Sequence, residues 1–265
     1  MKINVIQLFA FLSALLFPSR SFADDLQPFS LGTHKFSGGQ LTFVWDEQQK
    51  YIWVDASSIV AHPSKPLALE VLYFDAKKKL LGDSMRLCVM EGSLGRSTQT
   101  GHEPGKDFGP EDTKYFSARL YDCRLSEEVK KGARDLDTLK AALRSDYPLA
   151  RSSAAAAIQK MGEGGRAALP ELLQVLDPEQ PDLISNRYAI AAASYALGLL
   201  KEPTAVPKLE KLLDKQEIAK DILNSIAAYG PLAKPLIPKL KEISKNEAPP
   251  VQAGIQKLIE MIQAN

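Results

Sequence analysis

The chain has 265 residues, of which 45% are hydrophobic and 25% charged, with 33 Lys and Arg against 32 Asp and Glu. Residues 24–135 carry 15 Lys and Arg against 17 Asp and Glu, and residues 136–265 carry 16 against 15. Neither half has the excess of positive charge that is typical of nonspecific nucleic-acid binding, so we expect no nucleic-acid partner.

The first 23 residues have the pattern of a secretory signal peptide. Lys2 gives a positive start, residues 5–17 are uncharged and mostly apolar, and small side chains at Ser21 and Ala23 precede Asp24. The apolar run is shorter than the ~20 residues that span a bilayer, which favours cleavage after Ala23 over a retained anchor or a buried helix. No second apolar segment of spanning length follows, so we expect a mature chain without an integral membrane segment.

The remaining sequence favours the periplasm over secretion to the outside. No Asn-x-Ser or Asn-x-Thr triplet occurs in the chain, which disfavours a glycosylated secreted protein. We therefore expect an exported protein that stays in a bacterial periplasm, with secretion as the alternative.

A small antiparallel β-sandwich is predicted for residues 24–125. Short runs rich in aromatic and branched side chains alternate with polar turns, and no helical pattern lies between them. The expected strands are residues 41–45, 51–54, 67–74, 79–90 and 114–123. The segment resembles immunoglobulin-like or fibronectin-type domains only at this coarse level, because no Trp lies between the two cysteines.

Cys88 and Cys123 are the two cysteines of the chain. Because an exported chain meets oxidising surroundings, we predict that they form a disulfide; two buried thiols are the alternative. Their spacing and the three scattered histidines match no zinc site, so no metal or other cofactor is expected.

A long polar segment, residues 91–113, separates the last two predicted strands. It holds five glycines and two prolines. Its possible metal ligands are His102, Glu103, Asp107, Glu111 and Asp112. Their spacing matches neither an EF-hand nor a His-Glu metal helix, so a solvated loop is favoured over a cation site.

Residues 126–135 are predicted to be a linker, after which the composition becomes helical and repetitive. The stretch "RSSAAAAIQKMG" at 151–162 aligns with "RYAIAAASYALG" at 187–198. Glycines at 162, 198 and 230 and prolines at 170, 207 and 238 give a period of 31 to 37 residues. A period of this size indicates stacked helical hairpins.

The motifs of residues 136–265 resemble HEAT repeats, particularly the bacterial HEAT-like type also found in phycobilisome lyases. The matching features are the Asp-x-Pro-x-x-Arg turn at 146–151, the Ala-rich first helix, its terminal Gly and the Leu-Pro-x-Leu second helix. The second copy is longer before Arg187, and the third has Ala219 in place of the Arg. The resemblance implies a short α-solenoid; the bilin-lyase activity does not carry over, since no chromophore site is evident.

The hydrophobic pattern leads to the same arrangement. Second helices carry apolar residues spaced by three, four and seven, for example at Leu169, Leu172 and Leu176, and such a face needs a neighbouring hairpin to bury it. The alanines at 154–157 are then expected to form a seam where hairpins approach closely. Gly162 and Gly198 fit left-handed helix ends, and the prolines fit first helical turns.

Three residues are expected to tie successive repeats together. The resemblance implies that the repeat Arg, here Arg151 and Arg187, pairs with a turn Asp such as Asp146, and a role for these arginines in ligand binding is the alternative. The polar residues expected to face outward on the second helices form the candidate partner surface. They are Glu171, Gln174, Lys208, Lys211, Lys239 and Glu242.

No common catalytic motif occurs in the chain, so the sequence favours a non-catalytic binding or scaffold protein whose helical half engages a protein or peptide. One alternative is a β-sandwich that binds a glycan or the cell wall through Trp45 and Trp53, with the helices as a stalk. The other is a metal-dependent hydrolase that uses loop 91–113.

Overall fold

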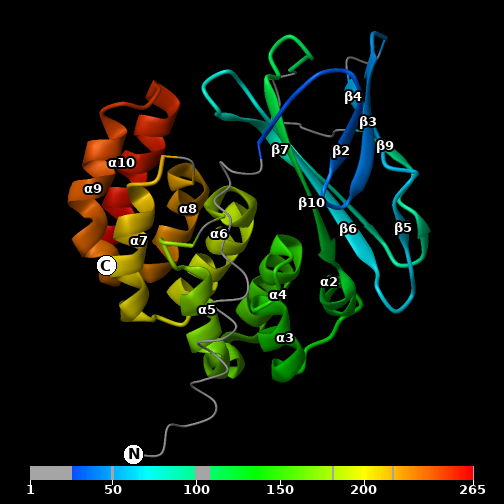
Figure 1. Ribbon diagram of the computed structural model, residues 1–265. Coiled ribbons are helices and arrows are strands. Elements are labelled where there is room, and N and C mark those ends of the chain that lie inside the picture. The colour runs from blue at the N-terminus through cyan, green and yellow to red at the C-terminus, as the bar shows by residue number, and fades with distance from the viewer. Residues whose placement is uncertain (1–25, 49–50, 99–107, 181, 217, 265) are drawn as a thin grey trace, which may run out of the picture.

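The computed structural model describes residues 26–48, 51–98, 108–180, 182–216 and 218–264, and the predicted signal peptide at 1–23 lies outside these ranges. Antiparallel strands form the N-terminal part of the described chain and helices form the C-terminal part, as Figure 1 shows. The predicted combination of an antiparallel β region and a helical half is therefore confirmed.

The described strands pair into three antiparallel sheets. The first has the order β1 (Gln27–Pro28), β10 (Tyr115–Asp122), β6 (Leu67–Phe74), β7 (Leu80–Val89). The second has the order β2 (Gly32–Phe36), β3 (Gly39–Asp46), β4 (Tyr51–Asp55), β9 (Arg96–Thr98). The third pairs β5 (Val60–Ala61) with β8 (Gly92–Ser93).

The two larger sheets share one apolar core. Phe43 and Val54 from the second sheet lie in the same cluster as Val71, Tyr73 and Phe116 from the first. All five predicted strands are present, and β6 has the predicted bounds. The short strands β1, β2, β5, β8 and β9 were not predicted, since they lack a run of alternating apolar residues.

The C-terminal part of the described chain is helical. Its helices are α2 (Arg124–Lys130), α3 (Leu136–Leu143), α4 (Pro148–Met161), α5 (Leu169–Val175), α6 (Leu183–Leu199), α7 (Val206–Leu213), α8 (Ala219–Ile226), α9 (Ile237–Ser244) and α10 (Pro249–Ala264). Three 3-10 segments, Gly162–Ala168, Pro203–Ala205 and Ala227–Leu236, precede α5, α7 and α9.

The helices pack in two rows (Figure 1). Helix α4 packs against α6, and α6 packs against α8. The second row lies on this one, with α3 on α4, α5 on α6 and α7 on α8. The predicted apolar residues of the short helices are buried at Leu172, Leu209 and Leu240, so each pair buries its apolar face against its neighbours.

The alanine-rich stretch lies in α4. Ala154 and Ala155 are completely buried, and Ala156 and Ala157 are partly buried. Since α4 packs against both α3 and α6, the small side chains allow these backbones to approach closely. The burial agrees with the predicted seam.

The turn after the first helix of a pair has the same backbone geometry in two places. Gly162 has φ 55° and ψ −129°, and Gly230 has φ 56° and ψ −130°. This region of φ and ψ is open essentially to glycine alone, which explains the residue type. Each of these glycines lies within a 3-10 segment, and Pro170, Pro207 and Pro238 lie in the first turn of the helix that follows, as predicted.

Gly198 corrects the prediction made for this turn. It lies inside α6 and has a negative φ, whereas Lys201 takes the left-handed φ of 53°. A Cβ built on Gly198 would lie 2.8 Å from the Cβ of Ala228 and 2.9 Å from the ring of Tyr229. The glycine is therefore required by close packing between α6 and the 3-10 segment after α8.

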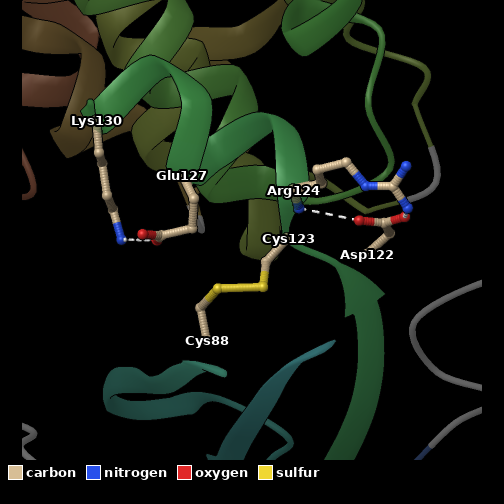
Figure 2. Close-up of a disulfide and its surroundings, with 6 residues drawn as sticks. All are labelled: Cys88, Asp122, Cys123, Arg124, Glu127 and Lys130. Carbon is tan, nitrogen blue, oxygen red and sulfur yellow. Dashed lines mark hydrogen bonds and ion pairs between the residues drawn. A yellow bond between two sulfur atoms is a disulfide. The ribbon is translucent and has the colours of Figure 1, made fainter. Parts of the chain in front are cut away.

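A disulfide joins the β region to the helices. Cys88 at the end of β7 is bonded to Cys123, which lies between β10 and α2, with a Cα–Cα distance of 6.1 Å (Figure 2). The predicted pairing is confirmed. Helix α2 occupies part of the predicted linker, and Cys123 and Ala68 of β6 belong to the same apolar cluster as the helices.

Candidate functional site

Arg151 connects α4 to α6. From α4 it donates a hydrogen bond to the side-chain oxygen of Asn186 in α6, and a second to the backbone carbonyl of Asp146 at 3.4 Å. The predicted partner Asp146 thus contributes its main chain in this contact. Asn186, 35 residues away in sequence, was not predicted, because nothing in the repeat pattern marks a polar residue beside Arg187 as a partner.

Arg187 has different surroundings although the repeat places it at the equivalent position. It is only 5% exposed and donates to the carbonyl of Ile184 and to the hydroxyl of Tyr188, both at 3.3 Å. Its guanidinium carbon also lies 4.5 Å from the centroid of the Tyr188 ring. These contacts fix the first turns of α6, which favours a structural role over ligand binding.

We expect Arg187→Ala to lower the free energy of unfolding by about 1 kcal/mol, through lost packing and hydrogen bonding. Urea denaturation followed by circular dichroism measures this change. An unchanged unfolding midpoint together with lost partner binding would contradict the structural role.

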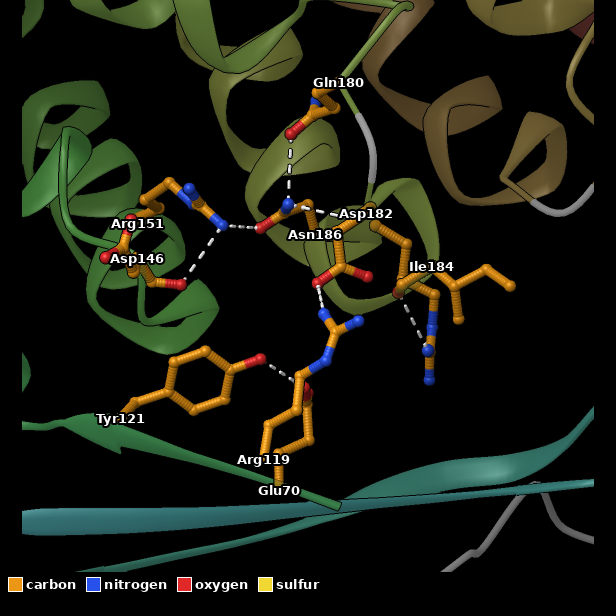
Figure 3. Close-up of polar contacts among 10 residues, drawn as sticks. Glu70, Arg119, Tyr121, Asp146, Arg151, Gln180, Asp182, Ile184 and Asn186 are labelled. Carbon is orange, nitrogen blue, oxygen red and sulfur yellow. Dashed lines mark hydrogen bonds and ion pairs between the residues drawn. The ribbon is translucent and has the colours of Figure 1, made fainter. Parts of the chain in front are cut away.

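A cluster of charged and polar side chains lies where the first sheet meets α4 and α6 (Figure 3). Arg119 of β10 forms an ion pair with Asp182, the residue before α6. Tyr121, also on β10, donates a hydrogen bond of 3.0 Å to Glu70 of β6, and Glu70 lies directly opposite Arg119 in the strand register. Asn186 donates a hydrogen bond of 2.8 Å to the backbone carbonyl of Asp182 and accepts one from Arg151, so it links this group to α4.

Burial governs the electrostatics of this cluster. Glu70 is 1% exposed, and the side chains of Arg119 and Asp182 are 19% and 16% exposed. Burial raises the pKa of Asp182 above its ordinary value, and the nearby Arg119 only partly opposes this effect. Burial likewise raises the pKa of Tyr121 and lowers that of Arg151.

The cluster contains two carboxylates and two guanidinium groups, so its formal charge is balanced. The network contributes little net stability, because desolvation of the charges offsets much of the Coulombic gain. The cluster joins the sheet to the start of α6 through Arg119 and Asp182, and Asn186 joins the start of α6 to α4 through Arg151.

Glu171 corrects one residue of the candidate partner surface. It is 8% exposed and forms an ion pair with Arg144, the residue that ends α3, so it does not face outward. Burial acts to raise the pKa of Glu171, but the hydrogen bond from Arg144 acts in the opposite direction and the net pKa is lowered. The pair ties α3 to α5.

The two buried carboxylates are expected to give opposite pH dependences. The folded state binds a proton on Asp182 more tightly than the unfolded state, so stability from this group falls as pH rises from 3.8 through the raised pKa. For Glu171 the pKa is lowered, so its contribution is lost as pH falls from 4.5 through the lowered pKa.

Urea denaturation of wild type, Asp182→Asn and Glu171→Gln over a range of pH tests these signs. The stability of wild type relative to Asp182→Asn should decrease with rising pH, and relative to Glu171→Gln it should increase. Two curves of the same slope would contradict the assignment.

Of the other candidate surface residues, Lys211, Lys239 and Glu242 line a groove between α7 and α9, whereas Gln174 and Lys208 do not. Gln174, Lys211 and Glu242 are exposed, and Lys208 and Lys239 are partly exposed. The groove has a volume of about 460 Å³. It is lined by Pro207, Glu210, Lys211, Asp214, Pro238, Lys239 and Glu242. Lys239 is held between Asp214 at 2.5 Å and Glu242 at 2.9 Å, which raises the pKa of Lys239 and ties α9 to the end of α7.

Two cationic side chains link successive pairs in a way the sequence did not indicate. Arg166 donates to the carbonyl of Leu200 at 3.1 Å, and Lys201 donates to the carbonyl of Ala228 at 2.7 Å. Leu200 ends α6, and Ala228 lies just after α8. Cations at these helix C-termini donate hydrogen bonds to carbonyl groups that have no partner within the helix, and they interact favourably with the helix dipole.

Trp45 and Trp53 lie on opposite faces of the second sheet. Trp45 packs against the core shared by the sheets. Trp53 is paired in register with the exposed Val44, and its indole N–H donates to Asp46 at 3.3 Å. The two rings therefore form no common surface for stacking a sugar.

The loop at 91–113 is described only in part. Strands β8 and β9 occupy its beginning, and Asp112 accepts a hydrogen bond of 3.2 Å from the N–H of Gly109. His102, Glu103 and Asp107 lie outside the described residues. Among the residues that are described, no group of three or more His, Cys, Asp and Glu side chains is arranged to hold a metal ion.

Comparison of the chain with protein-family models, with curated proteins and with solved structures gives no match. In the described part of the chain, no helix combines the length and the apolar character needed to cross a membrane.

Proposed function

We propose that the chain is an exported, periplasmic, non-catalytic binding or scaffold protein, and that its helical half is a HEAT-like α-solenoid that engages a protein or peptide partner. The shared geometry of Gly162 and Gly230, the prolines that begin α5, α7 and α9, and the two rows of helices support the solenoid. Solenoids of this kind commonly use their extended surfaces for partner binding.

The disulfide supports export. A structural bond between Cys88 and Cys123 persists in an oxidising compartment, and the pattern of residues 1–23 supplies a route to one.

The groove between α7 and α9 is the observation that carries the binding proposal. Its two prolines occupy equivalent positions in successive pairs, and its rim holds both signs of charge. Lys211 and Glu242, at equivalent positions of α7 and α9, differ in charge, so the groove presents a directional pattern to a ligand. Charge patterns of this kind set register and specificity in protein recognition.

The test compares charge reversal inside and outside the groove. A photo-crosslinking residue at position 211 should capture a defined periplasmic partner, and Lys211→Glu should weaken binding of that purified partner about fivefold or more. Lys257→Glu, on the exposed face of α10, is the matched control and should leave affinity unchanged. Thermal unfolding of both variants should match wild type. Equal effects of the two reversals would reject the groove as the binding surface.

The alternatives have their own readouts. Sedimentation with purified cell wall that Trp53→Ala abolishes would favour a glycan-binding β region. A hydrolytic activity lost on chelation would favour the metal-dependent enzyme.

A further inference from the structure

The ion pair between Arg119 and Asp182 connects the β region to the helices, and each of the two residues has another possible binding partner nearby. Asp182 is the N-cap residue of α6, yet its carboxylate accepts no hydrogen bond from the N–H groups of the first turn of this helix. An Asp at this position normally satisfies one of those orphan donors. Here the carboxylate points to Arg119 instead (Figure 3).

Arg119 also has a second carboxylate within its own sheet. Glu70 lies opposite it in the register of β6 and β10, and the Glu70 side chain lies beside it in the cluster. If Arg119 and Asp182 separate, neither charge is left without a partner. Glu70 remains next to the guanidinium of Arg119, and the N–H groups at the start of α6 can bind the carboxylate of Asp182.

The contacts between the two halves are unequal along β10. Near its end, Tyr121 packs on Tyr147 with ring centroids 5.3 Å apart, and Cys123 is bonded to Cys88. Two residues farther from this tether, the contact is the charged pair at Arg119. Figure 1 shows that β10 runs directly into α2, so the covalent and apolar contacts form one end of the joint.

We propose that the Arg119–Asp182 pair is a latch with two positions. In the closed position Asp182 binds Arg119 and holds the sheet against α6. In the open position Asp182 caps α6, Arg119 turns to Glu70, and the sheet swings about the Cys88–Cys123 end of the joint. The inference concerns the relative placement of the two halves and does not depend on which partner the helices bind.

Distance measurements test the latch. Spin labels on keto amino acids at Val44 and Met261, both exposed, leave the disulfide untouched and report the separation of the halves. Arg119→Gln and Asp182→Asn should each broaden the distance distribution toward longer values, since Asn still caps the helix. Arg124→Gln removes the exposed pair with Asp122 and the hydrogen bond to the carbonyl of Ser64, both next to the tether, and should leave the distribution unchanged. Distributions in both latch variants that coincide with wild type would overturn the proposal.

Amide hydrogen exchange separates a latch from a pair that is merely structural. In Arg119→Gln the freed Asp182 should cap α6 and slow exchange in its first turn by roughly fivefold. Asp182→Ala added to Arg119→Gln should abolish that protection. Exchange in Arg119→Gln that is equal to or faster than in wild type would mean that Asp182 has no second position.

Discussion

Replacement of both cysteines by alanine, Cys88→Ala with Cys123→Ala, is expected to lower the free energy of unfolding by about 3–4 kcal/mol. The bond closes a loop with a sequence separation of 35 residues, and its loss restores conformational freedom to the unfolded chain. Alanine is the suitable replacement because Cys123 is completely buried, and a serine would bury a hydroxyl there. Guanidinium denaturation under oxidising conditions measures the change.

Reduction of the wild-type protein provides the control. Wild type in dithiothreitol should unfold at the same denaturant concentration as the double variant, and the double variant should not respond to the reductant. A double variant as stable as oxidised wild type would show that the bond adds nothing to the fold. Because the bond joins β7 to the start of α2, we also expect the double variant to lose the coupled unfolding of the two halves.

Strands and helices could be predicted where the apolar residues recur with a clear period along the sequence. β6 contains a long buried run, and α5, α7 and α9 carry apolar residues at helical spacing, so the positions of these elements follow from the sequence. The five-residue strand β2, "GTHKF", has a single large apolar residue, and its pairing with β3 decides its conformation. The local sequence pattern does not show which strand will pair with this segment.

The polar cluster between the first sheet and α6 could not be predicted from the sequence, for a different reason. Glu70 inside "LALEVLYF" is a charge in a buried strand, which signals a buried partner. The partners in this cluster lie far along the chain, at Arg119, Tyr121 and Asp182, and only the packing of the sheet on α6 brings them together. The burial of Glu171 was not predicted for the same reason, because its partner Arg144 lies at the end of α3, two helices earlier in the chain.

Gly198→Ala is expected to destabilise the protein by about 1–2 kcal/mol, although the same change favours an isolated helix. The added methyl group would lie 2.8 Å from Ala228 and 2.9 Å from the Tyr229 ring. Tyr229 is completely buried, so its ring has little room to move. Overpacking between α6 and the segment after α8 should therefore outweigh the gain in helix propensity. Thermal and urea denaturation measure the net effect.

Gly254→Ala in α10 is the matched control, because a Cβ at Gly254 meets nothing within 4 Å. Here only the propensity term remains, and we expect stabilisation by about 0.5–1 kcal/mol. The two substitutions are chemically identical and both lie in helices, so their opposite signs would isolate the packing between neighbouring helix pairs. If both variants gain stability, α6 does not pack closely at Gly198 against the segment after α8. The close packing between helix pairs would then no longer support the solenoid proposal.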